Sequence, residues 1–163
     1  MRLEKMFIFV LIFLIGFLFA NMINFYLVYG LENPFSNNIF FNNNSKEAPY
    51  DFIKEDKIEV FQDKVIIHID GASLSRYAPT GSMIPVLDEG SNGIRIKPRS
   101  EEDVHIGDII TFEKENELIV HRVIEKGIDE KGIYYITKGD NNDIVDGKTR
   151  FKDIKYITIG ILW

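Results

Sequence analysis

The feature that most constrains how this chain can fold is an apolar stretch near its N-terminus. From Met6 to Ala20 every residue is apolar or glycine, and the apolar character resumes after Asn24 and continues to Gly30. A helix needs about 20 mostly apolar residues, at roughly 1.5 Å per residue, to cross the hydrocarbon core of a bilayer. Residues 6–30 are therefore predicted to form one transmembrane helix.

The charges that flank this stretch predict its orientation. Arg2 and Lys5 precede it, whereas no Lys or Arg follows it until Lys46. Basic residues are enriched on the cytoplasmic side of membrane helices. Residues 1–5 are therefore predicted to be cytoplasmic, and everything after Gly30 is predicted to lie outside.

A cleaved signal peptide is the competing interpretation of the same stretch. Its basic start and its apolar segment of about 7–15 residues would match residues 1–20. We favour an anchor for two reasons. A cut after Ala20 would place Leu18 where a small residue is expected, and the apolar character continues past the cut to aromatic residues that suit a membrane interface.

Composition excludes several classes of function. The net charge of −6 and the absence of a basic stripe argue against a nucleic-acid partner. The chain has no cysteine, which removes disulfides, thiolate catalysis and cysteine-ligated zinc. His68, His105 and His121 lack the spacing of a metal-binding motif. We therefore expect neither a metal nor a cofactor.

The rest of the chain divides into a linker and a β domain. Residues 33–50 are rich in asparagine, with proline near both ends, and residues 31–57 are predicted to be a linker. From residue 58 to residue 163, short runs of β-branched and aromatic residues alternate with turn signals, which predicts an antiparallel all-β domain. The runs are Ile58–Phe61, Val65–Ile69, Ile94–Ile96, Asp108–Phe112, Leu118–Ile124, Ile133–Thr137 and Tyr156–Leu162.

Three clusters within this domain could carry chemistry. They are Pro79-Thr80-Gly81-Ser82-Met83-Ile84-Pro85, Ile119-Val120-His121-Arg122-Val123, and Lys138-Gly139-Asp140-Asn141-Asn142 running on to Asp146. Taken singly, they read as a turn, a strand with a histidine, and a loop. Together they supply a hydroxyl nucleophile, an imidazole base, a carboxylate to orient the base, and donors for an oxyanion, which is what acyl transfer requires.

The residues of these motifs and their order along the chain resemble those of signal peptidase I of the archaeal and endoplasmic-reticulum type. Four boxes carry the resemblance: Gly81-Ser82-Met83-Ile84-Pro85, Gly107-Asp108-Ile109-Ile110, His121-Arg122-Val123, and Lys138-Gly139-Asp140-Asn141-Asn142. They cover roughly residues 60–163. The resemblance implies an antiparallel all-β, signal-peptidase-like catalytic domain on one N-terminal transmembrane helix.

The resemblance also implies a role for each site residue. Ser82 would be the nucleophile, and His121 the general base in place of the lysine that bacterial relatives use. Asp146 would be the required aspartate, and Asp140 would play a supporting part. The Thr80 hydroxyl and the Ser82 backbone N–H would form the oxyanion hole.

The residues alone leave the choice of carboxylate open. A flexible loop could bring Asp140, Asp143 or Asp146 to His121. The resemblance ranks Asp146 first and Asp140 second, and leaves Asp143 as a solvated charge. Arg122 alternates with His121 along a strand and is expected to point away from the site.

The function implied by the resemblance is that of a membrane-bound serine endopeptidase that cleaves N-terminal signal peptides from secreted or membrane preproteins. Its partners would be those signal peptides and the lipid bilayer. It would be a single-pass protein of the cell membrane, or of an endoplasmic-reticulum-type membrane.

The chain departs from the family in two segments, of which the stretch 88–103, before the second box, is longer than a minimal signal peptidase would need. About 50 residues separate Gly30 from Ser82, more than in many archaeal-type relatives. A specialised substrate, or accessory membrane subunits that use residues 33–60, would account for this. A non-catalytic membrane-anchored β module that binds a protein partner is the alternative function. A self-cleaving regulator is a third, although such proteins use lysine as the base.

Overall fold

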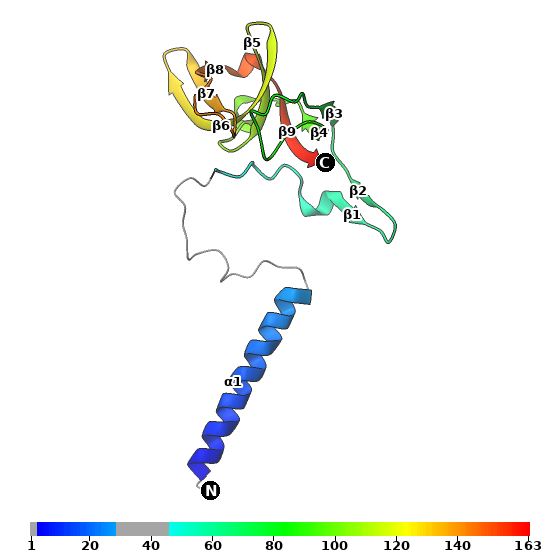
Figure 1. Ribbon diagram of the computed structural model, residues 1–163, viewed down its shortest axis with the longest axis vertical. Coiled ribbons are helices and arrows are strands. Elements are labelled where there is room, and N and C mark those ends of the chain that lie inside the picture. The colour runs from blue at the N-terminus through cyan, green and yellow to red at the C-terminus, as the bar shows by residue number, and fades with distance from the viewer. Residues whose placement is uncertain (1–2, 29–45) are drawn as a thin grey trace. The chain divides into compact units, whose positions relative to one another are not determined.

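The computed structural model describes residues 3–28 and 46–163, and the chain divides into two units between Ser45 and Lys46 (Figure 1). The first unit contains the helix α1, Leu3–Val28. The predicted boundary at Gly30 and the predicted linker from residue 31 to residue 45 lie outside the described residues.

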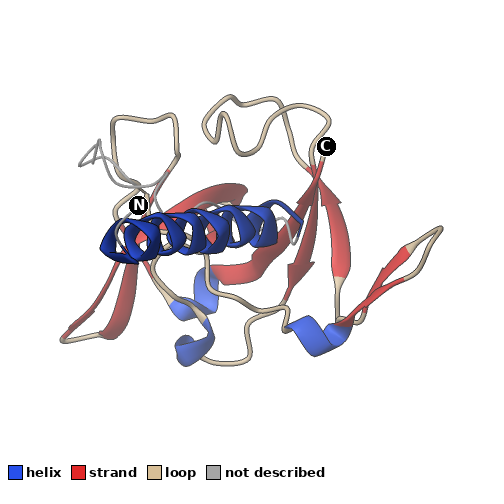
Figure 2. Cartoon of the chain, turned by 90° about the horizontal axis from the view of Figure 1, so that it is seen from below, coloured by secondary structure: helices blue, strands red, loops and turns tan. Residues whose placement is uncertain are grey.

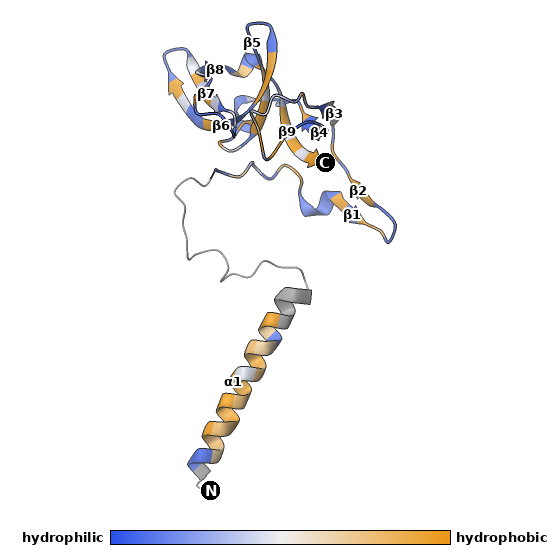
Figure 3. Cartoon of the chain, viewed as in Figure 1, coloured by the Kyte–Doolittle hydropathy of each residue, from blue (hydrophilic) through white to orange (hydrophobic). Residues whose placement is uncertain are grey.

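Helix α1 is apolar on every side along most of its length (Figure 3). Its segment Glu4–Ile23 is long and apolar enough to cross a membrane or to act as a signal sequence, and all 20 of its residues are exposed. The polar side chain of Asn21 is accommodated because its amide donates a hydrogen bond of 2.8 Å to the Phe17 carbonyl one turn earlier. A helix that buries no face against protein is suited to apolar surroundings.

The second unit is mainly β, as predicted, and its strands pair antiparallel (Figure 2). A two-stranded ribbon consists of β1 and β2, and a seven-stranded sheet has the order β3-β4-β9-β5-β6-β7-β8. The strand bounds are β1 Ile58–Val60, β2 Val65–Ile67, β3 Ser73–Arg76, β4 Asn92–Ile96, β5 Ile109–Lys114, β6 Glu117–Asp129, β7 Gly132–Lys138, β8 Lys148–Thr149 and β9 Ile154–Leu162.

Each of the seven predicted runs overlaps a strand, but two strands were not predicted. Strand β3 has the sequence Ser-Leu-Ser-Arg and lies at an edge of the sheet, and β8 contains only two residues. Neither contains a β-branched or aromatic run that would signal a strand. Strands β6 and β7 form a hairpin in which only Glu130 and Lys131 make the turn, because β6 extends to Asp129.

Strand β5 lies between β9 and β6, and the core packs against both of its faces. One cluster includes Ile110 and Phe112, and the other includes Ile109. Alternate residues of a strand point to opposite faces. Burial on both faces therefore explains why β5 begins with an almost continuous apolar run.

The segment from Lys46 to Phe52 belongs to the second unit, although the sequence placed it in the linker. Phe52 packs against the core, and the backbone N–H of Tyr50 donates a 2.9 Å hydrogen bond to the Asp108 carboxylate. The Tyr50 ring stacks on His105 with a centroid distance of 4.1 Å. The structured domain therefore begins before residue 58, the boundary predicted from the composition. We call residues 46–52 the strap.

Candidate active site

His121 and Asp146 form a close pair. His121 lies on β6 and is 7% exposed, and its Nδ1 is 2.6 Å from Asp146 Oδ2. The Thr137 hydroxyl donates a 2.8 Å bond to the same oxygen, and the Asp146 backbone N–H donates to the Thr137 carbonyl at 2.9 Å. The carboxylate is thus held in place by β7. An ionised Asp146 keeps the proton on Nδ1 and leaves Nε2 as the proton acceptor of the ring.

Ser82 lies in a turn that is held from the 139–142 loop. The Asn141 backbone N–H donates to the Ser82 carbonyl at 2.8 Å, and the Asn141 side-chain amide donates to the Gly81 carbonyl at 3.1 Å. A Cβ on Gly139 would lie 2.6 Å from the Ser82 carbonyl oxygen, so only glycine permits this approach. The Ser82 hydroxyl is 3.2 Å from the Thr80 hydroxyl.

Asp140 does not contact His121 and instead pairs with Arg122. The guanidinium Nε and Nη2 donate to the two carboxylate oxygens at 2.9 and 2.8 Å. Both side chains are almost fully buried. Burial alone would raise the pKa of Asp140, but the hydrogen bonds and charge of Arg122, together with Lys46, outweigh it and hold the pKa below its ordinary value.

A cleft of about 480 Å³ brings Ser82 and His121 together. The residues that line it include Ser75 and Arg76 of β3 and residues 117–121 of β6. Both of these strand segments have an unpaired edge. β3 is an edge strand, and β6 pairs with β7 only from Arg122 onward. Within residues 46–163, no hydrogen bond joins the Ser82 hydroxyl to His121.

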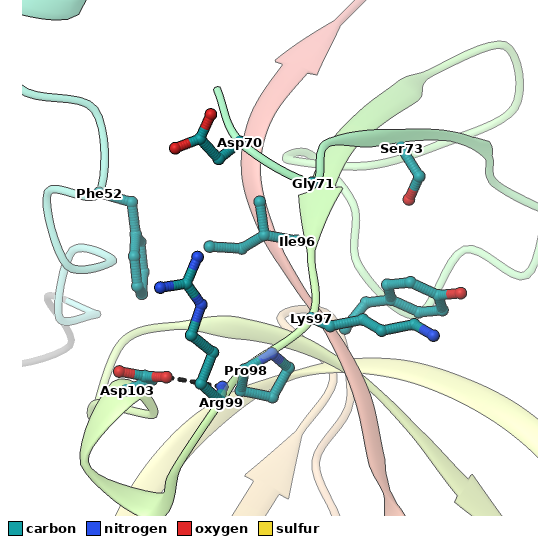
Figure 4. A pocket seen from close by; sticks show the side chains of 10 residues that line it. Phe52, Asp70, Gly71, Ser73, Ile96, Lys97, Pro98, Arg99 and Asp103 are labelled. Carbon is teal, nitrogen blue, oxygen red and sulfur yellow. Dashed lines mark hydrogen bonds between the residues drawn. The ribbon is translucent and has the colours of Figure 1, made fainter. Parts of the chain in front are cut away.

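A second cavity, of about 510 Å³, has no comparable chemistry (Figure 4). Its lining includes Phe52, Tyr156 and charged side chains of both signs, and a 2.7 Å bond joins the Arg99 backbone N–H to Asp103. None of the predicted site residues lines it. The Ser82 cleft is therefore the candidate active site.

The remaining candidate residues lie elsewhere. Asp143 is exposed, as expected of a solvated charge. Asp108 is fully buried and accepts the backbone N–H groups of His105 and Tyr50, and burial raises its pKa. His68 contacts Glu59 at 2.7 Å. Within the described part of the chain, no three His, Asp or Glu side chains are grouped as metal ligands would be.

The sequence did not reveal the residues that hold the site together. Thr137 supports Asp146, Asn141 supports the Ser82 turn, and Arg122 supports Asp140. Arg122 does point away from the site, but it fixes the loop that carries Asn141. The only signal for Asn141 was its position beside Asp140 in the fourth box.

No protein-family model matches the chain, and no curated protein matches it. A functional assignment therefore depends on the motifs and on the geometry of the cleft.

Proposed function

We propose that this chain is a membrane-anchored serine endopeptidase of the signal peptidase I type, which removes N-terminal signal peptides from secreted or membrane preproteins. The observation that carries the proposal is that His121, which lines the same cleft as Ser82, is in contact with Asp146 at 2.6 Å. A hydroxyl and an imidazole in one cleft, with a carboxylate that orients the imidazole, are the parts of a serine protease site.

The Ser82 hydroxyl attacks the scissile carbonyl in this mechanism, and His121 Nε2 takes its proton. The Asp146 carboxylate keeps the ring in the required tautomer and stabilises the imidazolium that forms. His121 then gives the proton to the leaving amine, and an acyl ester remains on Ser82. Water, deprotonated by the same imidazole, hydrolyses the ester and regenerates the hydroxyl.

The oxyanion of each tetrahedral intermediate would be bound by the Ser82 backbone N–H and the Thr80 hydroxyl. The 3.2 Å contact between the Thr80 and Ser82 hydroxyls supports this role, because it puts a donor next to the attacking atom. Hydrogen bonds of a catalytic site often tighten only when substrate is bound. When substrate is bound, the Ser82 hydroxyl would form its hydrogen bond with His121 instead of with Thr80.

The unpaired strand edges around the cleft support binding of an extended peptide. Residues 117–121 of β6 offer backbone donors and acceptors directly before His121, and β3 offers a second edge. Strand addition obtains affinity from main-chain hydrogen bonds and selectivity from pockets for alternate side chains. The resemblance implies small residues next to the scissile bond.

The test is cleavage of a purified preprotein in detergent. We expect Ser82→Ala and His121→Ala to lose essentially all cleavage. Asp143→Asn is the matched control, because it removes an exposed carboxylate from the same loop as Asp146, and it should cleave normally. Full activity of Ser82→Ala would overturn the assignment.

The exposed β1–β2 ribbon favours the alternative, a non-catalytic β module that binds a protein partner. Its register puts Ile58 opposite Ile67 and Val60 opposite Val65 on one face, and all four side chains are exposed. Two-stranded ribbons are marginally stable alone, so an apolar face of this kind is suited to a partner. This alternative predicts that Ser82→Ala retains the full cellular function, whereas Val60→Lys loses it.

A further inference from the structure

The cleft contains a buried hydroxyl that the proposed mechanism does not use. Thr111 lies on β5, paired with Val120 of β6 and Tyr156 of β9. It is 2% exposed, and it lines the same cleft as Ser82 and His121. Its Oγ1 is buried and makes no hydrogen bond with any of the described residues.

Two of the three other buried threonines in the described residues have a hydrogen-bond partner for the hydroxyl. The Thr137 hydroxyl donates to Asp146 at 2.8 Å, and the Thr158 hydroxyl is 2.7 Å from the Tyr77 hydroxyl. Buried polar groups are nearly always paired, because an unpaired one loses its bonds to water without replacement. Thr111 is therefore the exception among Thr111, Thr137 and Thr158.

Folding gives no reason for a hydroxyl at this position. The neighbours Ile110 and Phe112 belong to the apolar core, and valine has almost the same shape and an equal or better preference for strands. Because Thr111 borders the cleft, a ligand in the cleft can supply the partner that the described residues do not.

We propose that Thr111 determines specificity by forming a hydrogen bond with an uncharged polar side chain of the bound peptide, one that carries a hydroxyl or a carboxamide. This inference rests on the proposed protease function. The side chain would be neutral, because the buried apolar residues Ile109, Met83 and Leu87 pack next to this part of the cleft and would disfavour a desolvated charge.

Such a contact discriminates strongly between peptides of the same shape. A peptide with Val in place of Thr fills the same volume but leaves the Thr111 hydroxyl unpaired in the complex. A site that hydrogen-bonds its substrate rejects analogues that lack the group, whereas an apolar site scarcely tells them apart. We expect about a tenfold difference in kcat/KM, which corresponds to a single partly buried hydrogen bond.

The experiment compares pairs of preproteins that differ by Thr or Val at one position, taken in turn over the residues that precede the scissile bond. At one position the wild type should cleave the Thr substrate about tenfold more efficiently. The Thr111→Val enzyme should lose this preference, mainly through slower cleavage of the Thr substrate. Thr149→Val is the matched control, since Thr149 is buried on β8 and does not line the cleft, and it should keep the tenfold preference.

A second measurement tests the unpaired hydroxyl without any substrate. Urea unfolding should show Thr111→Val to be at least as stable as the wild type, whereas Thr158→Val should be less stable because it leaves the Tyr77 hydroxyl unpaired. An equal loss of stability in both variants would overturn the inference. So would a wild type that cleaves preproteins but shows no preference at any position. A wild type that cleaves none would instead refute the protease function.

Discussion

At the scale of single residues, the structure gives Asp146 and Asp140 different surroundings. Asp146 contacts the imidazole and is partly exposed, whereas Asp140 is buried against a guanidinium. Under the proposed function we therefore expect changes to Asp146 to affect catalysis and changes to Asp140 to affect folding.

Asp146→Asn tests the orienting carboxylate. An amide keeps the size of the side chain but offers an N–H to the ring, which favours the wrong imidazole tautomer. We expect kcat to fall by about 10²–10⁴-fold with little change in KM. The new amide can donate to the Thr137 hydroxyl, which can also accept a hydrogen bond, so the unfolding curve should stay close to that of the wild type. Normal cleavage by Asp146→Asn would remove Asp146 from the mechanism.

Asp140→Asn should mainly destabilise the fold. It leaves the Arg122 guanidinium buried without a counter-charge, and loss of one partner of a buried pair typically costs about 3–5 kcal/mol. Urea unfolding at neutral pH measures this loss. If Asp140→Asn unfolds like the wild type but cannot cleave, Asp140 acts in catalysis and the two roles must be exchanged.

The same pair predicts how stability depends on acid. The folded pKa of Asp140 lies below its ordinary value of 3.8, so the folded state binds the proton less readily than the unfolded chain. The contribution of Asp140 is complete above pH 3.8 and is lost as the pH falls through the lowered folded pKa. Asp140→Asn should therefore show a smaller decrease in stability over this acid range than the wild type.

At the scale of the elements, the strap connects the start of the domain to the site. Lys46 Nζ donates to the Asp140 carbonyl at 2.6 Å, and the Arg122 guanidinium donates to the carbonyls of Glu47 and Gly107. Asp140 in turn precedes Asn141, which holds the Ser82 turn. Changes that displace the strap should consequently also shift the turn that contains Ser82.

Gly107→Ala tests this connection, with Gly132→Ala as the matched control. Both glycines have a positive φ, +95° and +97°, so both variants incur similar backbone strain. A Cβ on Gly107 would lie 2.2 Å from the Ala48 carbonyl oxygen, whereas a Cβ on Gly132 would meet nothing within 4 Å. We expect Gly107→Ala to lose roughly 1–3 kcal/mol more in urea unfolding and to lower kcat. Equal losses in the two variants would show that the strap is not packed as described.

Sequence patterns predicted the β elements well where packing produces them. β5 is buried on both faces and is an almost continuous apolar run, and the predicted run in β7 contains the buried residues Tyr135 and Thr137. The strap could not be predicted, because its bonds are made by backbone groups and by partners such as Asp108 and Asp140, which lie 58 and 94 residues away. Its composition therefore resembled that of the linker before it.

At the scale of the whole chain, motif order predicted the candidate site more fully than periodicity could. Ser82 and His121 do line one cleft, but the carboxylate that contacts His121 lies 25 residues farther along the chain and reaches it through a loop. Alternation along β6 predicted only that Arg122 would point away from the site. Its pairing with Asp140 required the three-dimensional arrangement.

The proposed topology can be tested because the chain has no cysteine, so a single introduced cysteine is the only thiol available for labelling. Lys131 lies in the exposed β6–β7 turn, and Glu4 lies at the start of α1. A membrane-impermeant maleimide should label Lys131→Cys in intact cells and Glu4→Cys only after permeabilisation, because the flanking basic residues predict a cytoplasmic N-terminus. The mature protein should keep its full mass, since an anchor is not removed. Loss of the first 20 or so residues would identify α1 as a signal peptide. Labelling of Glu4→Cys alone in intact cells would show the opposite orientation. The cleft would then lie on the cytoplasmic side, where no exported signal peptide could reach it.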